Sequence, residues 1–300
     1  MEATDLEVGV RTTVKAEIKE TGRGTIPAKK FAEMVRELPD GKEIEVSTSE
    51  DQKKVTIRCG KVRAMLHTLA PEDYPAIPEF PREAALTFKK ALFLDMLRKS
   101  SFAVSSDETR HALNGIYFVV KGTEVKMVAT DGRRLAMVTH TSTTKHADAS
   151  VIIPSKATNE LARLLSLSGD EDDEISVAPA SNQIAFKWKH YSEEVSLVSR
   201  LIEGNFPNYD QVIPKGKDVE LRVNTAELLS AVRRAALFAQ DRGGSARISL
   251  KTNSVRISAN TANLGDEEEE LDADYKGAAF DIAFNPQFLI DILRNMSHPE

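Results

Sequence analysis

The stretch ATDGRRLAM (129–137) recurs in weaker form elsewhere in this 300-residue chain. ATDLEVGVR, which begins at residue 3, shares Ala-Thr-Asp with it, and ANTANLGDE, which begins at residue 259, keeps the alanine and a polar pair. The copies lie roughly 130 residues apart, and self-similarity at a fixed spacing indicates repeated structural units. We therefore interpret the chain as three imperfect copies of one unit.

Each copy continues into a strand-like segment that ends at a proline and is followed by a helical pattern. The three segments are TIPAKKFAEMVREL, VIIPSKATNELARLL and AFNPQFLIDILRNM, with prolines at positions 27, 154 and 286. Proline fits the first turn of a helix, where its missing N–H group is no loss. Apolar residues then recur at helical spacing, so we expect a helix after each proline.

A second helix belongs to the unit. FKKALFLDMLRKSSFAV (88–104) matches NTAELLSAVRRAALFAQ (224–240), and we expect a short strand before each, at Ala85–Thr87 and Glu220–Val223. The alternating segments GIYFVVKGTEVKMVA and RISLKTNSVRISA follow and are typical of antiparallel hairpins. Two copies share a proline-rich ending, LAPEDYPAIP and LIEGNFPNYDQVIP.

These elements predict an α+β fold of three repeated domains, each with two helices packed on antiparallel sheets. We place the domains at residues 1–82, 83–214 and 215–300. Measured against the middle copy, about 40 residues are missing from the front of the first and about 45 from the back of the third. We therefore expect the middle domain to be complete and the outer two to be truncated.

Composition excludes several classes of protein. With 41% apolar and 29% charged residues the chain has the profile of a soluble globular protein. No apolar run approaches the roughly 18 residues of a membrane span, and the opening MEATDLEVGV does not resemble a signal peptide. The single cysteine, Cys59, excludes an internal disulfide framework, fits a reducing cytoplasm and is best interpreted as a small buried hydrophobe.

Charge is segregated along the chain, although the net charge is −6. Acidic residues gather in GDEDDE (169–174) and DEEEELDAD (266–274), where we expect loops or strand edges. Any one basic helix is most simply a solvated face, but repetition favours a surface that attracts phosphates without reading sequence. The basic residues on the expected helices are Lys29, Lys30, Arg36, Lys89, Lys90, Arg98, Lys99, Lys156, Arg163, Arg233, Arg234 and Arg294.

Motifs for chemistry are not evident in the sequence. The histidines stand apart without metal-ligand spacing, and GRGT (22–25) does not continue into a phosphate-binding loop. A contiguous acidic run such as DEEEE is more typical of a solvated edge than of a calcium loop. We therefore predict no catalytic residue, no metal and no cofactor.

The segments IPAKKF, LNGIYF, ATDGRRLA, VIIPSKA and EGNFPNYDQVIP occur together, and this combination resembles the bacterial DNA sliding clamps, the beta subunit of DNA polymerase III. The resemblance covers essentially the whole chain. It implies a DNA-clamp fold with helices inside and sheets outside, in which two subunits join head to tail into a ring around duplex DNA. It also implies a cytoplasmic processivity factor whose partners are the polymerase III core, the clamp loader and other clamp-motif proteins.

The resemblance further implies three sets of site residues. A pocket between the second and third domains, which receives a linear peptide, maps to Leu113, Thr130, Gly132, Arg133, Arg134, Leu135, Pro207 and Val212, with Arg133 on its rim. Because the family's C-terminal Met-Pro-x-x-Leu-like tail has no counterpart here, we expect this pocket to be half-open. The subunit interface maps to Ala64 and Leu66 on one side and Leu237 and Phe238 on the other. DNA contacts would include the basic residues above with Arg110 and His111.

Two other functions remain open at this point. The chain could be an enzyme on a duplicated scaffold, which would require polar groups converging in one cleft. It could also be a fragment that keeps the clamp fold but neither closes into a ring nor binds partners well.

Overall fold

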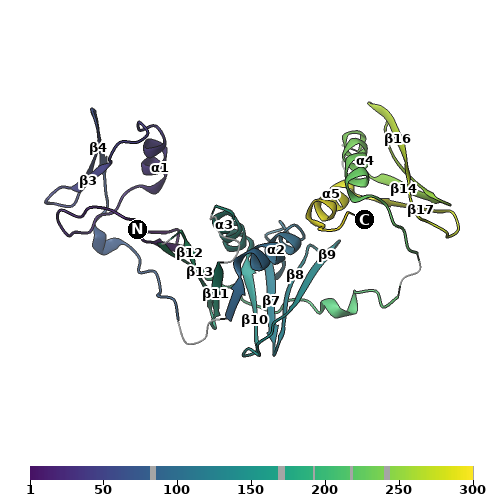
Figure 1. Cartoon of the computed structure of the whole chain (residues 1–300), viewed down its shortest axis with the longest axis horizontal. Coiled ribbons are helices and arrows are strands. Elements are labelled where there is room, and N and C mark those ends of the chain that lie inside the picture. Colours follow the sequence, from purple (N-terminus) through teal and green to yellow (C-terminus); the bar gives the residue numbers. More distant parts are fainter. Residues whose placement is uncertain (82–85, 168–172, 192, 217–218, 240–243, 300) are drawn as a thin grey trace. The chain divides into compact units, whose positions relative to one another are not determined.

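The computed structural model describes residues 1–81, 86–167, 173–191, 193–216, 219–239 and 244–299 (Figure 1). The chain forms two compact units. One comprises Met1–Lys89 with Ser168–Arg200, and the other comprises Lys90–Leu167 with Leu201–Glu300. Each unit has its own antiparallel sheets.

The first unit contains a sheet to which two repeats contribute strands. Its order is β1-β2-β13-β12-β11-β6, and every pairing in it is antiparallel. The strands are β1 (Glu2–Thr4), β2 (Val8–Thr12), β6 (Leu86–Lys89), β11 (Glu174–Pro179), β12 (Gln183–His190) and β13 (Glu193–Arg200). Because Leu197 of β13 pairs with Val10 of β2, the start of the chain extends the sheet of the middle repeat.

A smaller sheet and one helix complete this unit. The sheet has the order β3 (Glu45–Thr48), β4 (Lys54–Cys59), β5 (Val62–His67), and α1 spans Ala28–Arg36 directly after Pro27. A short 3-10 turn, η1 (Pro71–Asp73), follows β5. Cys59 is buried and free beside the buried Val55 and Ile57, which confirms its interpretation as a core residue.

The middle repeat places two helices on a four-stranded sheet in the second unit. The sheet has the order β10 (Ala149–Pro154), β7 (Gly115–Lys121), β8 (Glu124–Thr130), β9 (Leu135–Thr141). Helices α2 (Lys90–Ser101) and α3 (Ser155–Ser166) pack on each other and on this sheet (Figure 1). Phe93 of α2 meets Phe118 of β7 edge-on, with ring centroids 6.3 Å apart, and both are fully buried.

The third repeat has the same order of elements. Helix α4 (Thr225–Phe238) precedes β14 (Ala246–Lys251), β15 (Ser254–Thr261), β16 (Gly265–Asp272) and β17 (Phe280–Phe284), and α5 (Pro286–Asn295) follows. The sheet order is β16-β15-β14-β17, and α4 and α5 pack on each other. The side chains of Asn224 and Asn285 accept N–H groups of the first turns of α4 and α5, which is the capping role that asparagine prefers.

Most expected elements are present, with shifts at the ends. The helix expected from residue 88 begins at Lys90, because Thr87 and Phe88 pair with β11 as strand β6. Only Pro286 lies in a first helical turn, whereas Pro27 and Pro154 are the capping residues just before it. Of the expected short strands, 220–223 contributes a single bridge, Arg222 with Asp274, and Ala85 lies outside the described residues.

The acidic stretch 266–274 is largely an edge strand rather than a loop. Strand β16 holds most of it, and Arg256 of the neighbouring β15 forms ion pairs with Glu268 (3.1 Å) and Glu270 (2.8 Å). Residues 169–172 of the other acidic stretch lie outside the described residues. No helix in the described part of the chain is long and apolar enough to cross a membrane.

Candidate functional site

The turn between β8 and β9 is a hydrogen-bonded loop built from the repeat motif itself. The Thr130 hydroxyl donates to the Arg134 carbonyl oxygen (2.7 Å) and accepts the Gly132 N–H (3.1 Å). One oxygen of Asp131 accepts the N–H groups of Arg133 (2.9 Å) and Arg134 (3.0 Å). Gly132 has φ +84°, a region that favours glycine, and a Cβ there would lie 2.9 Å from the Arg110 Nη1 atom. The Thr-Asp-Gly part of the repeat motif therefore stabilises this turn: the threonine and aspartate side chains form its hydrogen bonds, and the glycine adopts its positive φ.

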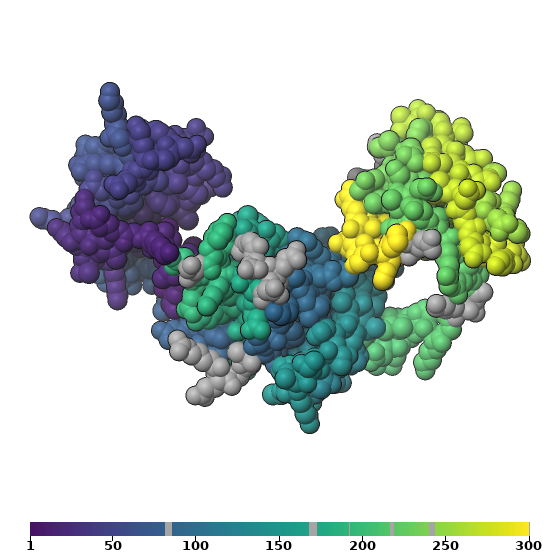
Figure 2. Space-filling model, viewed as in Figure 1, coloured from purple at the N-terminus to yellow at the C-terminus, as the bar shows by residue number. Residues whose placement is uncertain are grey.

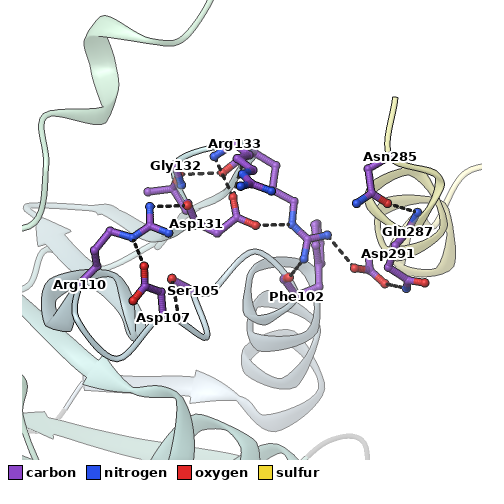
Figure 3. A network of polar contacts seen from close by, with 12 residues as sticks. Phe102, Ser105, Asp107, Arg110, Asp131, Gly132, Arg133, Asn285, Gln287 and Asp291 are labelled. Atoms are coloured by element: carbon purple, nitrogen blue, oxygen red, sulfur yellow. Dashed lines mark hydrogen bonds and ion pairs between the residues drawn. The ribbon is translucent and has the colours of Figure 1, made fainter. Parts of the chain in front are cut away.

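A polar network joins three elements of the second unit, and Figure 3 labels Asp131, Phe102 and Asp291 in it. All three of these residues are hydrogen-bonded to the guanidinium of Arg134. Its Nε donates to Asp131 (3.0 Å), its Nη2 to the Phe102 carbonyl oxygen (2.6 Å) and its Nη1 to Asp291 of α5 (2.6 Å). The guanidinium also lies over the Phe288 ring, 4.5 Å from its centroid. Charge-assisted hydrogen bonds and cation–π contacts of this kind are strongest when partly desolvated, as here.

A second arginine stabilises the same turn from the loop before β7. Arg110 donates from Nε to Asp107 (2.9 Å) and from Nη1 to the Asp131 carbonyl oxygen (2.9 Å). The Thr109 hydroxyl and N–H, with the Arg110 guanidinium, hold the pKa of the Asp107 carboxyl below its ordinary value. Arg110, predicted from the family to contact DNA, thus has at least one structural role within its own domain.

The Asp131 carboxyl remains ionised for a related reason. Partial burial acts to raise its pKa, but hydrogen bonds from the N–H groups of Arg133 and Arg134 and from the Arg134 guanidinium outweigh burial, so the pKa lies below the ordinary 3.8. Each carboxylate of the network is paired with a guanidinium or an N–H group. Such an arrangement fixes geometry and is poorly suited to proton transfer. Within the described residues, no three His, Cys, Asp or Glu side chains are grouped so as to hold a metal.

The predicted pocket residues fall into two groups. The first group lies on or beside the β8–β9 turn and consists of Thr130, Gly132, Arg133, Arg134 and Leu135. The Arg133 side chain is exposed. Leu113 is buried in the 3-10 turn η3 (His111–Leu113). This turn directly follows Arg110, whose guanidinium donates to the β8–β9 turn at the Asp131 carbonyl oxygen.

Pro207 and Val212 belong to a separate segment, 201–216, which contains the 3-10 turn η4 (Tyr209–Gln211). Phe206 of this segment stacks on Tyr117 of β7, with ring centroids 4.8 Å apart. Both Pro207 and Val212 are exposed, and the segment (green) protrudes from the surface in Figure 2. Their joining with Leu135 into one pocket stays a prediction.

Most of the predicted DNA-contacting side chains are exposed. The exposed ones are Lys29, Lys30, Arg36, Lys89, Arg98, Arg110, His111, Lys156, Arg163, Arg233, Arg234 and Arg294. Lys90 is instead buried at the start of α2, and Lys99 is half-buried with an ion pair to Asp95 (2.7 Å). Arg234 is paired within its own chain, because its Nε and Nη2 atoms each donate a hydrogen bond of 2.7 Å to the Glu269 carboxylate of β16.

The predicted interface residues differ in their surroundings. Ala64 and Leu66 are half-buried on β5, an edge strand, where they pair with Ile57 and Val55 and so share the core-facing side of the sheet. Leu237, at the end of α4, is 58% exposed, whereas Phe238 packs against the core of its own repeat.

Family models of the DNA polymerase III beta subunit match nearly the whole chain. The N-terminal domain model matches residues 1–78, the central domain model residues 87–208 and the C-terminal domain model residues 210–300. The chain belongs to this family. It is a DNA sliding clamp of the replicative polymerase, a processivity factor rather than a catalyst.

Known clamps agree with this assignment. The beta sliding clamps of Staphylococcus epidermidis and Vibrio cholerae are each 31% identical to this chain, and the alignments cover 99% of it and 79% of each relative. The structure of the Bartonella birtlesii sliding clamp bound to griselimycin superposes with a TM-score of 0.89 at 32% identity, covering 99% of this chain and 79% of that one. The Pseudomonas aeruginosa beta subunit gives a TM-score of 0.86 at 29% identity, with 99% and 80% covered.

Sequence reasoning missed three residues of the site in this clamp. Asp291, Phe288 and Phe102 contact the Arg134 side chain. All three lie in segments of the repeat that the sequence predicts to be helical, but the sequence singled out none of them as a candidate site residue. Gln287 and Asp291 at helical spacing indicate a polar side of α5, but nothing in the sequence connects that side with a turn 157 residues away.

The acid stability of this clamp should depend on Asp131. Because the folded-state pKa is lowered, the carboxylate contributes stability that is fully present above pH 3.8 and is lost as pH falls through the folded-state value. In chemical denaturation at several pH values, Asp131→Asn should therefore be less stable than the parent near neutrality. The difference should shrink as the solution becomes more acidic. A constant difference down to about pH 2 would contradict this assignment.

Proposed function

We propose that this clamp closes, as a head-to-tail homodimer in the cytoplasm, into a ring around duplex DNA. It would bind the polymerase III core, the clamp loader and other clamp-motif proteins at the Arg134 site, which includes the predicted pocket residues. The division into domains at residues 82 and 214 is part of the proposal. The observation that carries it is the repetition of paired helices with exposed cations in a chain of the sliding-clamp family.

The DNA part of the proposal rests on charge position rather than on net charge. Helices α2 with α3 and α4 with α5 form equivalent pairs, and each pair exposes arginine side chains such as Arg98, Arg163 and Arg233. Cations attract phosphates at any base sequence, and a ring dissociates only by opening or by sliding off an end. Weak local contacts are then compatible with long retention.

Retention should depend on the topology of the DNA. Loaded clamp should remain on circular duplex and leave the same duplex once it is linearised, as measured by gel filtration of the complexes. Equal loss from both forms would contradict a closed ring.

The role of the helix cations can be tested on the same complexes. Arg233→Ala should reduce the salt dependence of DNA binding, by about 0.9 in the log–log slope for each phosphate that the arginine neutralises. Arg233 suits this test because its side chain is exposed and forms no hydrogen bond or ion pair with any described residue. Lys61→Ala, in the exposed turn between β4 and β5, is the matched control and should leave the slope unchanged. Equal slopes for all three proteins would remove Arg233 from the DNA surface.

The partner site combines an apolar side chain with a fixed cation. Leu135 is half-buried beside the Arg134 network, and the exposed Pro207 and Val212 provide further apolar surface on segment 201–216 of the same unit. An extended peptide is suited to such a surface, because apolar anchors provide affinity and a few polar groups set its orientation.

Griselimycin, with which two clamps of this family have been crystallised, is the ligand with which we propose to probe the partner site. Leu135→Ala should weaken its binding by about 1–3 kcal/mol in isothermal titration, the usual cost of truncating a buried anchor. Val138→Ala, which truncates another half-buried side chain of β9 on the opposite face of the strand, is the control. Unchanged affinity of the Leu135 variant would contradict the pocket assignment.

The dimer is supported by the exposed edge strand β5 and by the exposed apolar end of α4. In sedimentation at micromolar concentration, the parent should be a dimer and Leu237→Asp a monomer, because a buried charge without a partner is strongly disfavoured. Leu167→Asp is the matched control: Leu167 is similarly exposed (60%) and also ends a helix, α3. A monomeric parent would instead favour a fragment that does not close.

A further inference from the structure

Asp291 lies where the third repeat contacts the turn of the middle repeat. Its Oδ2 atom is 2.6 Å from Arg134 Nη1, and both side chains are only 19% exposed. The two residues are 157 positions apart in sequence, so the pair exists only because α5 packs near the β8–β9 turn within the second unit (Figure 3).

The Asp291 carboxylate is itself held in place by its own helix. Its Oδ1 atom accepts from the Gln287 side chain (2.6 Å), one turn earlier in α5. The Gln287 N–H in turn donates to the capping side chain of Asn285 (2.9 Å). The carboxylate therefore presents its second oxygen to Arg134 in a defined position rather than as one of several rotamers.

Arg134 retains donor capacity after these contacts. A guanidinium has five N–H groups, and three of them meet acceptors on Asp131, Phe102 and Asp291. Among the described residues, the remaining two, one on each terminal nitrogen, have no acceptor. The Phe288 ring stacked at 4.5 Å further restricts the plane of the group. The arginine is thus held in a defined position, and two of its donors are left without an acceptor among the described residues.

We propose that Asp291 is a positioning residue of the partner-peptide site, which orients the Arg134 guanidinium so that its two remaining N–H groups meet a carbonyl or carboxylate oxygen of the bound peptide. The inference rests on the proposed partner site. It adds that α5 of the third repeat takes part in binding through Arg134 and without touching the peptide. A group held in its bound geometry loses less entropy on binding than one that must be ordered.

A purely structural tie between the two repeats would have a different signature. In that case loss of the Asp291 charge would lower the free energy of unfolding, while the folded protein would bind its ligand with unchanged affinity. For a positioning residue, the effect on affinity disappears when Arg134 is removed, because there is no guanidinium left to orient. A double-mutant cycle on affinity separates the two roles.

The experiment is a calorimetric titration of the full chain with griselimycin. Asp291→Asn should weaken binding roughly tenfold, the usual effect of losing one charge-assisted hydrogen bond, and Asp291→Glu should recover part of it. In the Arg134→Ala background, Asp291→Asn should cause no further loss. The matched control is Asp95→Asn, which also removes a helical aspartate from an ion pair of 2.7 Å and should bind as the parent does.

Three outcomes would overturn the inference. If Asp291→Asn binds griselimycin as the parent does while Leu135→Ala binds it more weakly, Asp291 has no positioning role and the proposed partner site still stands. An equal loss of affinity in both arginine backgrounds would show that Asp291 does not act through Arg134. No binding of griselimycin by the parent would overturn the proposed partner site and this inference together.

Discussion

Burial of the apolar faces of the paired helices determines where the charged side chains of this clamp can lie. In the middle repeat, Phe93, Leu97, Leu161 and Leu165 are buried between α2, α3 and the sheet of β7–β10. Because a helix has one apolar stripe to bury, the cations at other helical positions are left on the opposite side. Ala231, Val232 and Ala235 have the same effect on α4, which leaves Arg233 and Arg234 exposed. An acidic protein can in this way still present a basic surface.

The polar cluster at the β8–β9 turn fixes the positions of its own charged groups. Removing charged groups from water is costly unless each is paired, and here Asp131, Arg134 and Asp291 satisfy one another while partly buried. The pairing lowers the Asp131 pKa, so the carboxylate stays charged and the turn keeps its shape at neutral pH. The proposed function of this site, binding a partner, depends on such fixed geometry, as the proposed positioning role of Asp291 does.

Much of the fold could be predicted because its signals are local. Alternation in GIYFVVKGTEVKMVA and helical spacing in VIIPSKATNELARLL each predicted the right element, and their recurrence indicated the repeat. The errors lie where tertiary contacts override local pattern. Lys89 belongs to a strand because β11 pairs with it, and Lys90, predicted to face DNA, is buried. Of the site, the β8–β9 turn was predictable from its motif, whereas the partners Asp291 and Phe288 were not.

The sequence by itself determined the repeated unit, the secondary structure within it, the segregation of charge and membership in the sliding-clamp family, because each is written in short segments or in their spacing. The tertiary structure alone decided which residues meet across long separations. Strand β2 extends the sheet that holds β13, and α5 provides the carboxylate that fixes Arg134. Neither contact has a local signature, because each arises when separately folded elements pack and their remaining backbone or charged groups find partners.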